Sequence, residues 1–521
     1  MFMDERPREV ELKLELPARE VERLKRAFRE DPHLAEPPRT DLLVSTYFDT
    51  DRRDLRDAGV SLRVRREGKR RTQTIKQTEA PAAGSFDRAE WERDIAGDKP
   101  DLKSAEGTAL APLLSRRVRA RLKPVFRTAV NRTTYRLGNR GSAVKLAFDR
   151  GRIEAGRRSS PLAEVEIELE RGEPAELFAL ARRLGAREPP RLQIKSKAER
   201  GYDLIASAAP APVKFTKLKL ARGTSSAHAF RLIAHACLRQ LVANEPSLRH
   251  GDAEAVHQMR TALRRLRAAF SLFSDLVSDA QLARLKGEIK WITGELAPAR
   301  ELDVYLAQAV APAKNRHRDG GMSTLEADLR RRRAQALARA RIAAASPRYR
   351  NLLFDLVAWI ETGAWANPRE KAARRGLDRA VRKQAAEELS RRRRKIKKRG
   401  RAVRELEPRQ RHKLRIAIKK VRYATDFFAA LFPGRRAKKR RKAFVATLKQ
   451  LQDALGDLND IAVREKMAGE LVRRSGRRSR ARAEVFAVGL VTGREEARSK
   501  PLVAAAADAI ADFRKSKPFW R

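Results

Sequence analysis

The sequence of 521 residues contains one cysteine, seven histidines, five tryptophans and six tyrosines. The single cysteine, Cys237, excludes an internal disulfide framework and a zinc site built from several cysteines, and it fits a reducing compartment. No uninterrupted apolar run reaches the roughly 18 residues that a membrane-spanning helix needs. The first residues are charged instead of forming the apolar core of a secretory signal. We therefore expect a cytoplasmic protein that does not enter a membrane.

Positive charge is abundant and unevenly distributed. Lys and Arg total 118 against 66 Asp and Glu, which gives a net charge of +52. Residues 211–521 hold 73 of the basic residues and 31 of the acidic ones. Part of this excess is a solvated surface, but a charge of this size repels itself unless an anion binds, so we expect a polyanionic partner. The basic stretches contain few aromatic residues for base stacking, which makes nucleic acid the weaker alternative.

In the first 205 residues, charged and apolar side chains alternate in several short stretches. Residues 9–16 read Glu-Val-Glu-Leu-Lys-Leu-Glu-Leu, and similar stretches are 62–65, 72–76, 88–92, 144–149 and 164–170. Such alternation is typical of a β-strand with one charged face. For one strand, a solvated face is the simpler interpretation. Charges of both signs on several strands favour a closed barrel with a polar interior, where glutamates hold hard divalent cations and basic residues hold phosphate oxygens.

These stretches resemble the CYTH domain, the family of triphosphate tunnel metalloenzymes. Glu9-Val10-Glu11-Leu12-Lys13 matches the ExExK signature of that family. In family order follow residues 47–50 (Tyr-Phe-Asp-Thr), 62–65, 74–76, 88–92 (from Arg88), Arg127, Arg132, 145–149, 164–170 and 196–202. The resemblance implies an eight-stranded antiparallel β tunnel with a helical cover. Members hydrolyse inorganic triphosphate, thiamine triphosphate or RNA 5′-triphosphates, and some cyclise ATP.

The resemblance also implies a role for each charged position of the tunnel. Catalysis would rest on Glu9, Glu11, Lys13 and Lys76. Triphosphate would be bound by Arg63, Arg65, Lys76, Arg132, Lys145, Lys197 and Arg200, and metal by Glu9, Glu11, Asp149, Glu166 and Glu168. The cofactor would be two ions of Mg²⁺ or Mn²⁺, one bridging the phosphates and one lowering the pKa of the attacking water. Arg127 and Arg132 cannot both point inward on a regular strand, and we favour Arg132.

After a small, proline-containing stretch at 206–212, the sequence becomes helical in period and repeats itself. The basic stretch 257–267 returns 155 residues later as 412–422, and 285–296 matches 444–455. Positions 1, 4, 8 and 11 of each basic copy carry His, Arg, then Arg or Lys, and Arg. On a helix these four side chains form one ridge beside an apolar face. A repeat of about 150 residues predicts two four-helix-type bundles related by a pseudo-twofold axis.

This half resembles the CHAD domain, the conserved histidine α-helical domain that is often fused to CYTH. Its marks are the two His-bearing helices and the turn at 455–460, from which the first copy departs at Ala297 and Glu301. CHAD domains bind inorganic polyphosphate on a basic surface between the bundles. The residues that we expect to bind polyphosphate are His257, Arg260, Arg264, Arg267, Lys290, His412, Arg415, Lys419, Arg422 and Lys449.

The predicted fold class is therefore α+β and multidomain. We expect a tunnel domain at 1–205, a linker at 206–224 and a helical domain at 225–521, with repeats at about 225–365 and 366–521. The basic run 391–398 lacks an apolar period and is interpreted as solvated or flexible, although it could widen the polyanion footprint.

The predicted function is metal-dependent hydrolysis of inorganic triphosphate to diphosphate and phosphate, with a helical module that binds long-chain polyphosphate and could associate with its granules. One alternative is a non-catalytic protein that binds polyphosphate granules. Another is a hydrolase or cyclase that acts on thiamine triphosphate or ATP. Turnover of inorganic triphosphate separates these alternatives, and the sequence predicts no oligomeric state.

Overall fold

The computed structural model describes residues 11–77, 85–86, 89–138, 141–207, 209–316, 320–474 and 479–521. The contacts divide the chain into two units, residues 1–211 with 346–363 and residues 212–345 with 364–521. Glu9 and Arg88, to which the resemblance assigns positions in the tunnel, lie outside the described residues. Within the described ranges, every helix is too short or too polar to span a bilayer.

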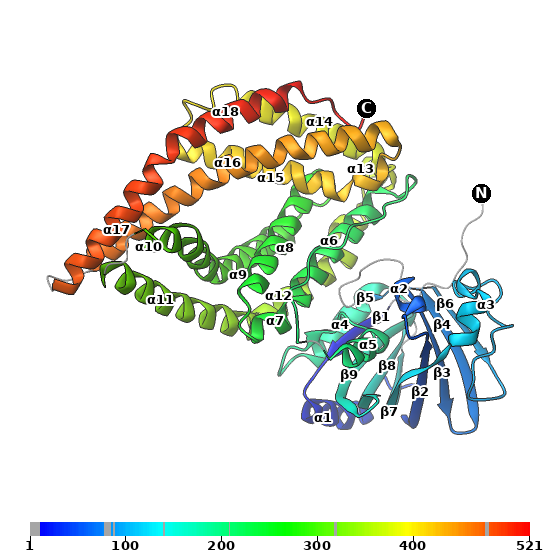
Figure 1. Cartoon of the computed structure of the whole chain (residues 1–521). Helices are drawn as coiled ribbons and strands as arrows, with labels where there is room; N and C mark the ends of the chain where they lie inside the picture. The colour runs from blue at the N-terminus through cyan, green and yellow to red at the C-terminus, as the bar shows by residue number, and fades with distance from the viewer. Residues whose placement is uncertain are drawn as a thin grey trace. The chain divides into compact units, whose positions relative to one another are not determined.

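Unit 1 is built on one antiparallel sheet (Figure 1). Among the described residues its strands are β1 (Glu11–Glu15), β2 (Arg39–Asp49), β3 (Val60–Glu67), β4 (Arg70–Gln77), β5 (Ser85–Phe86), β6 (Ala89–Asp94), β7 (Lys123–Gly138), β8 (Ala143–Ala155), β9 (Arg158–Arg171) and β10 (Arg191–Leu192). Their hydrogen-bonded order is β10-β1-β9-β8-β7-β2-β3-β4-β6, and β5 pairs with β1. The antiparallel sheet is confirmed. Among the described residues this path is open and has more than the expected eight strands. The two-residue strand β10 forms one end, and the two-residue strand β5 lies off the path and pairs with β1.

The strands keep the predicted alternation of charged and apolar faces. In β9, Val165 and Ile167 are fully buried, while Glu164, Glu166 and Glu168 lie at the alternate positions. The apolar face packs under α1 (Ala18–Arg29) and α4 (Pro174–Leu184). Each fully buried Val, Leu or Phe contributes about 1.5–3 kcal/mol to folding, so this face fixes which way the charged side chains point.

Unit 1 also contains short helices and one helix from much later in the chain. The short helices are α2 (Asp54–Asp57), η1 (Ala111–Leu113), α3 (Arg116–Arg121) and α5 (Lys197–Ala206). The distant one, α12 (Pro347–Thr362), packs on α4, where the rings of Phe354 and Phe178 are 5.8 Å apart and Arg182 pairs with Asp355 at 2.9 Å. Unit 1 thus takes a helix from the stretch expected to end the first repeat.

Unit 2 is helical, as predicted. Its described helices are α6 (Ser226–Ala243), α7 (Glu245–Arg249), α8 (Ala253–Leu272), α9 (Ala280–Tyr305), η2 (Leu306–Val310), α10 (Ala311–Lys314), α11 (Gly320–Ala345), η3 (Ala364–Ala366), α13 (Lys371–Asp378), α14 (Val381–Arg399), α15 (Pro408–Phe427), η4 (Ala429–Leu431), α16 (Arg435–Arg474), α17 (Ser479–Ala497) and α18 (Ser499–Lys515). Helix α6 packs on α8, α8 on α9 and α9 on α11, while α14 packs on α15 and α15 on α16. Figure 1 shows α16 in orange running beside α18 in red.

Two contacts in unit 2 follow the 155-residue offset. The backbone N–H of Ser226 donates to the carbonyl of Arg379 at 2.8 Å, and that of Val381 donates to the carbonyl of Thr224 at 2.9 Å. Residues 224 and 226 correspond to 379 and 381, so each copy begins by bonding to the other in the same way.

The basic run 391–398 is a regular part of α14. Leu389 and Ile396, seven residues apart, are buried, and Arg392 is half-buried. The run is solvated as predicted, since Arg391, Arg394, Lys395 and Lys398 are exposed. It is not without an apolar period, because two apolar anchors two turns apart hold the helix against the rest of the unit.

Candidate active site and basic ridge

Unit 1 contains a cavity of about 890 Å³ on the charged face of the sheet. Its basic lining residues are Lys13, Arg56, Arg63, Arg65, Lys76, Arg132, Lys145, Lys195 and Lys197. Its acidic lining residues are Glu11, Glu90, Glu92, Asp149, Glu166, Glu168, Glu170, Glu199 and Asp203. The described lining therefore holds as many carboxylates as cations.

The strand register explains why opposite charges meet in this cavity. Lys13 lies opposite Glu166 and Glu11 opposite Glu168 on β1 and β9, while Arg132 lies opposite Asp149 on β7 and β8. Residues directly opposite in an antiparallel pair point to the same face. Because every second residue of a strand points to the same face, the register alone directs all these side chains into the cavity.

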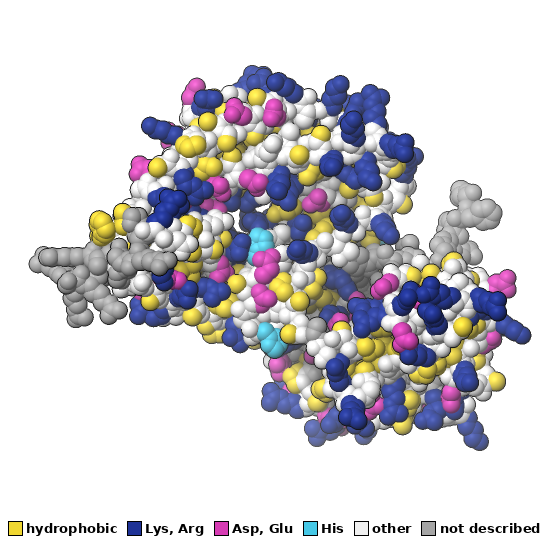
Figure 2. Space-filling model, viewed as in Figure 1, with side chains coloured by type: hydrophobic (Ala, Val, Ile, Leu, Met, Phe, Trp, Pro, Cys, Tyr) yellow, Lys and Arg dark blue, Asp and Glu magenta, His cyan; other side chains and the backbone are white. Residues whose placement is uncertain are grey.

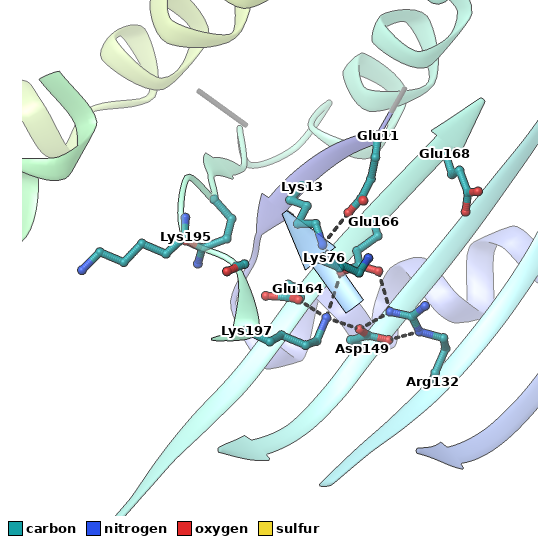
Figure 3. Close-up of polar contacts among 12 residues, drawn as sticks. Glu11, Lys13, Lys76, Arg132, Asp149, Glu164, Glu166, Glu168, Lys195 and Lys197 are labelled. Atoms are coloured by element: carbon teal, nitrogen blue, oxygen red, sulfur yellow. Dashed lines mark hydrogen bonds and ion pairs between the residues drawn. The ribbon is translucent and has the colours of Figure 1, made fainter. Parts of the chain in front are cut away.

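Three buried carboxylates, those of Asp149, Glu164 and Glu166, lie together at the centre of Figure 3. Each offers an oxygen within 4.8 Å of the others. The expected metal ligands included Asp149 and Glu166 but not Glu164, although Glu164 belongs to the same alternating run. Its position at the start of that run gave the only signal for it. A set of oxygen donors of this kind suits a hard divalent cation.

Lys197 of α5 points into this carboxylate group, whereas Lys195 points away from it (Figure 3). The Lys197 ammonium pairs with Asp149 at 2.7 Å, with Glu166 at 2.8 Å and also with Glu164. Burial would lower the pKa of Lys197, but the three carboxylates outweigh it and raise that pKa. Lys197 thus serves as a cation inside the acidic group.

Arg132 and Lys13 complete the charge balance around the carboxylates. Arg132 donates to both oxygens of Asp149, at 2.7 and 2.6 Å, and to Glu166 at 2.5 Å. Lys13 pairs with Glu11 at 2.5 Å and with Glu166 at 2.7 Å. Burial would raise the pKa of Glu166, yet Lys13, Lys197 and Arg132 hold it well below its usual range. Glu166 is therefore an anion despite its burial.

The cations of β3 and β4 are less completely paired with carboxylates, which here come from β6. Lys76 pairs with Glu90 at 2.6 Å, while Arg63 is 3.9 Å from Glu90 and 3.8 Å from Glu92. The charge of Arg63, burial and the charge of Arg132 lower the pKa of Arg65 to about 10. Among the described residues, the buried Nε groups of Arg63 and Arg65 donate no hydrogen bond. These donors are free for an anion.

Of the remaining predicted residues that the structure describes in unit 1, one lines the cavity and two do not. Lys145 lines the cavity and pairs with Glu168 at 2.8 Å. Arg127 is exposed and pairs with Glu154 outside the cavity. Arg200 bonds to Glu164 at 3.1 Å and to the carbonyl of Pro161 at 3.0 Å, and it does not belong to the described lining.

Sequence reasoning gave no role to Tyr47, although its motif was noted. Tyr47 lies opposite Arg63 in the register of β2 and β3 and lines the cavity. Burial would raise the pKa of its phenol, but Arg63, Lys197 and Arg65 lower it. The phenol is thus a further polar group that faces the cations.

Unit 2 brings the two basic ridges together. His257, Arg260 and Arg264 come from α8, and Arg415 and Lys419 from α15, two helices that pack on each other. Burial and the charges of Arg415 and Arg264 lower the pKa of Lys419 to about 7. Burial, with Arg264, also lowers the pKa of Arg260 to about 10. Each ridge therefore lies within the electrostatic field of the other.

The charges that flank the ridges are related by the repeat. Arg260 is 3.9 Å from Glu301, and Arg415 is 3.6 Å from Asp460. The buried Nε groups of Arg264 and Arg415 donate no hydrogen bond among the described residues. Burial and the charge of Arg300 lower the pKa of His257 to about 4, so this histidine is neutral near pH 7.

Other predicted polyphosphate ligands lie apart from this cluster. Arg422 donates to Gln452 at 3.0 Å, and the ring of His412 is hydrogen-bonded to Asn459 at 2.6 Å. Arg267, Lys290 and Lys449 are exposed. Figure 2 shows Lys and Arg side chains spread over the viewed face of the helical unit, so net charge alone does not locate a site.

Two family models match the chain, the CYTH domain over residues 7–202 and the CHAD domain over residues 232–469. The chain therefore belongs to the proteins that carry a CYTH domain and a CHAD domain together, as the motifs predicted.

A curated protein and a solved structure are each similar to part of the chain. The inorganic triphosphatase of Haemophilus influenzae is 31% identical over 160 residues, which are 31% of this chain and 45% of that protein. The match thus spans less than half of that relative. The crystal structure of the CHAD domain from the plant Ricinus communis is 28% identical, covers 58% of this chain and 96% of that domain, and has a TM-score of 0.50.

Proposed function

We propose that unit 1 is a metal-dependent inorganic triphosphatase. One observation carries this proposal: a single cavity is lined by under-paired guanidinium groups, those of Arg63 and Arg65, and by Asp149 and Glu166 of the buried carboxylate group. The first binds phosphate oxygens and the second binds the cations that accompany them. The likeness to an inorganic triphosphatase points to the same substrate.

The phosphate oxygens are bound by Arg63, Arg65, Lys76, Arg132 and Lys145, with Lys13 at the acidic end of the cavity. Guanidinium groups present paired N–H donors that match phosphate oxygens, and they keep their charge at any physiological pH. None of these side chains needs to form a covalent intermediate. Their part is to hold the triphosphate still and to offset the charge that develops on the leaving diphosphate.

The residues also fit the expected divalent cations. Asp149, Glu164 and Glu166 would hold one ion, and Glu11 and Glu168, which lie directly opposite each other on β1 and β9, would hold a second with Glu9. When bound, Mg²⁺ or Mn²⁺ neutralises phosphate charge and lowers the pKa of a water. With an ion held there, the Lys197 ammonium would be available to pair with phosphate oxygens.

We further propose that the sheet closes into the tunnel that the resemblance implies. Strand β6 pairs with β4, and β5 pairs with β1 at the other end of the path. Only residues 87 and 88 separate β5 from β6 along the chain. One continuous segment therefore connects both edges. Within each strand, the cavity residues lie at alternate positions, except Val60 and Leu169.

For unit 2 we propose polyphosphate binding along the paired ridges. Arg260, Arg264, Arg415 and Lys419 form its centre, and His257, Arg267, Lys290, His412, Arg422 and Lys449 lie around it. The under-paired Nε groups of Arg264 and Arg415 support this assignment. A phosphate chain offers oxygens at short intervals and needs no aromatic platform.

The reciprocal bonds of Ser226 and Val381 support a pseudo-twofold relation between two copies. We propose domain limits of 1–205, 206–224 and 225–521, with the copies meeting near residue 365. Polyphosphate then determines where the cytoplasmic protein lies, including association with granules.

The test is phosphate release from inorganic triphosphate with Mg²⁺ or Mn²⁺, compared with ATP, thiamine triphosphate and long-chain polyphosphate. We expect triphosphate to be the preferred substrate. Glu166→Gln with Glu168→Gln should abolish release, whereas Glu154→Gln, outside the cavity, should retain it. Absence of release from every substrate would leave only the binding function, and preference for thiamine triphosphate or ATP would replace the substrate proposed here.

A further inference from the structure

Helix α15 carries two adjacent lysines in different surroundings. Lys419 belongs to the ridge, whereas Lys420 donates a 3.1 Å hydrogen bond to the hydroxyl of Ser271 near the end of α8. Arg392 of α14 donates to the carbonyl of Ser271 at 2.6 Å and to its hydroxyl at 3.2 Å. Three helices thus bring an ammonium, a guanidinium and a hydroxyl to one place.

Positive charge prevails around Lys420. Its pKa is lowered by burial and then by the charges of four basic side chains, those of Arg392, Arg267, Lys395 and Lys286. Glu388 compensates Arg392 in part, through a 3.0 Å ion pair, and Asp275 is a second carboxylate that acts on Arg392. The remaining excess of cations lies in a partly desolvated place, which favours an anion.

The corresponding place in the other copy is neutralised by the protein itself. Over the 155-residue offset, Lys420 corresponds to Arg265 and Ser271 to Asp426. Arg265 pairs with Asp426 at 3.7 Å and donates to Gln240 at 3.2 Å. The contact between α8 and α15 is therefore present twice. In one, the carboxylate of Asp426 pairs with Arg265, and in the other Lys420 bonds to the Ser271 hydroxyl while the carboxylate of Glu388 pairs with Arg392.

Two more substitutions add positive charge to the place that has Ser271 where the other copy has Asp426. Gln240 corresponds to Lys395, and the buried Cys237 corresponds to Arg392. One copy surrounds its cation with Asp426, Gln240 and Cys237. The other has Ser271, Lys395 and Arg392 there, and Glu388, which corresponds to Ile233, offsets one of these positive charges. Packing does not require this difference, since the neutral version fills the same position in the first copy.

We propose that Lys420, Arg392 and Ser271 form a discrete site for one small oxyanion of the phosphate class. Arg267, Lys286 and Lys395 form its rim. The oxyanion supplies the negative charge that Asp426 supplies beside Arg265. Guanidinium and ammonium donors, with a hydroxyl that donates or accepts, match the oxygens of such an ion. A free phosphate ion and a phosphate of a chain offer the same chemistry, and the experiment distinguishes them.

The experiment follows Lys420 in the full chain. Lysines are acetylated near neutral pH with and without inorganic phosphate, at constant ionic strength set with chloride, and each site is quantified by peptide mass spectrometry. We expect phosphate to slow acetylation of Lys420 several-fold and to leave the exposed Lys413 of the same helix unchanged. Equal rates in phosphate and chloride, with no protection by long-chain polyphosphate, would overturn the proposal. Protection by polyphosphate alone would assign the site to a phosphate of a chain.

Two variants at one position separate charge from size. Ser271→Asp gives this place the carboxylate of the other copy, so phosphate should no longer protect Lys420. Ser271→Asn has nearly the same size without the charge and should keep the protection. Loss of protection in both variants, or in neither, would contradict a site that is defined by the missing carboxylate.

A third variant tests whether this site is separate from the ridge. Arg264→Gln with Lys419→Gln removes ridge cations, and phosphate should still protect Lys420. If the ridge binds no polyphosphate, protection at Lys420 is unaffected. If protection disappears with the ridge cations, the separate site is disproved while the ridge is retained.

Discussion

The hydroxyl of Tyr202 donates a 2.7 Å hydrogen bond to the fully buried carboxylate of Asp49. The same carboxylate accepts from the backbone N–H groups of Leu55 and Arg56 at the start of α2. Tyr202 thereby joins α5, and with it Lys197, to the end of β2. At the other end of α5, Ser196 and Glu199 form a capping box.

Tyr202→Phe should lower both stability and substrate affinity. It leaves a buried carboxylate short of one donor, which costs about 1–3 kcal/mol in the free energy of unfolding. Because α5 is then less firmly held, KM for triphosphate should rise. Denaturant unfolding and steady-state kinetics measure the two effects. The matched control is Tyr135→Phe, which removes a hydrogen bond to the carbonyl of Lys25 and should alter stability alone.

Lys197→Met should strengthen metal binding in the absence of substrate. The Lys197 ammonium pairs with Asp149, Glu164 and Glu166, so an incoming cation must displace it. If displacement costs about 1.4 kcal/mol, its removal makes Mn²⁺ binding about tenfold tighter. Isothermal titration calorimetry with Mn²⁺ measures this. Lys195→Met removes a lysine that pairs with Asp203 and should leave the affinity unchanged. Weaker binding by the Lys197 variant would show that the ammonium organises the carboxylates.

Arg65→Met should raise stability and weaken substrate binding. Arg63, burial and Arg132 lower the pKa of Arg65, which means that its charge is unfavourable in the folded protein without substrate. We expect a gain of about 0.5–2 kcal/mol in the free energy of unfolding, with a higher KM for triphosphate. Arg127→Met, at the exposed pair with Glu154, should show neither effect. A destabilised Arg65 variant would indicate that the charge has a partner in the free protein.

Polyphosphate binding should weaken as the pH rises through the range in which Lys419 loses its proton. The lysine has a pKa of about 7 in the free protein, and a bound polyanion raises it, so binding takes up a proton and is favoured at lower pH. The charged groups that set this pKa are Arg415, Arg264, Asp460 and Arg260. Affinity at about pH 6 should exceed that at about pH 8.5 at equal ionic strength. Lys419→Arg, which stays charged, should reduce the difference. An unchanged pH dependence would exclude Lys419 as its source.

The sequence predicts the strands with strict alternation better than the others. Stretches 62–65, 72–76, 144–149 and 164–170 fall within β3, β4, β8 and β9. The lengths of β2 and β7 were missed, because Thr, Ser and Tyr share their inward face with charges and blur the pattern. Glu164 is not predicted as a metal ligand, because only its place at the start of the run distinguishes it from the other glutamates.

In unit 2 the sequence predicts which side chains share a helix face, but not which of them point toward the partner helix. Residues at positions 1, 4, 8 and 11 of a helix span an arc of roughly 80°, and only the part that faces the partner helix meets its charges. Arg264 and Lys419 lie in that part. Arg422 turns to Gln452, and Arg267 acts on Lys420 instead of the ridge. The place of α12 was missed for another reason, since its apolar residues do not reveal which unit they pack against.

The described lining of the unit 1 cavity has as many carboxylates as cations, which has a consequence for the order of binding. A lone triphosphate would draw the cations from their carboxylates, and a lone divalent ion would do the opposite. When both enter, each takes the partners that the other releases. Metal and substrate should therefore bind with positive cooperativity, each raising the affinity for the other by the same factor. The charge balance of the cavity then discriminates against single ions of either sign.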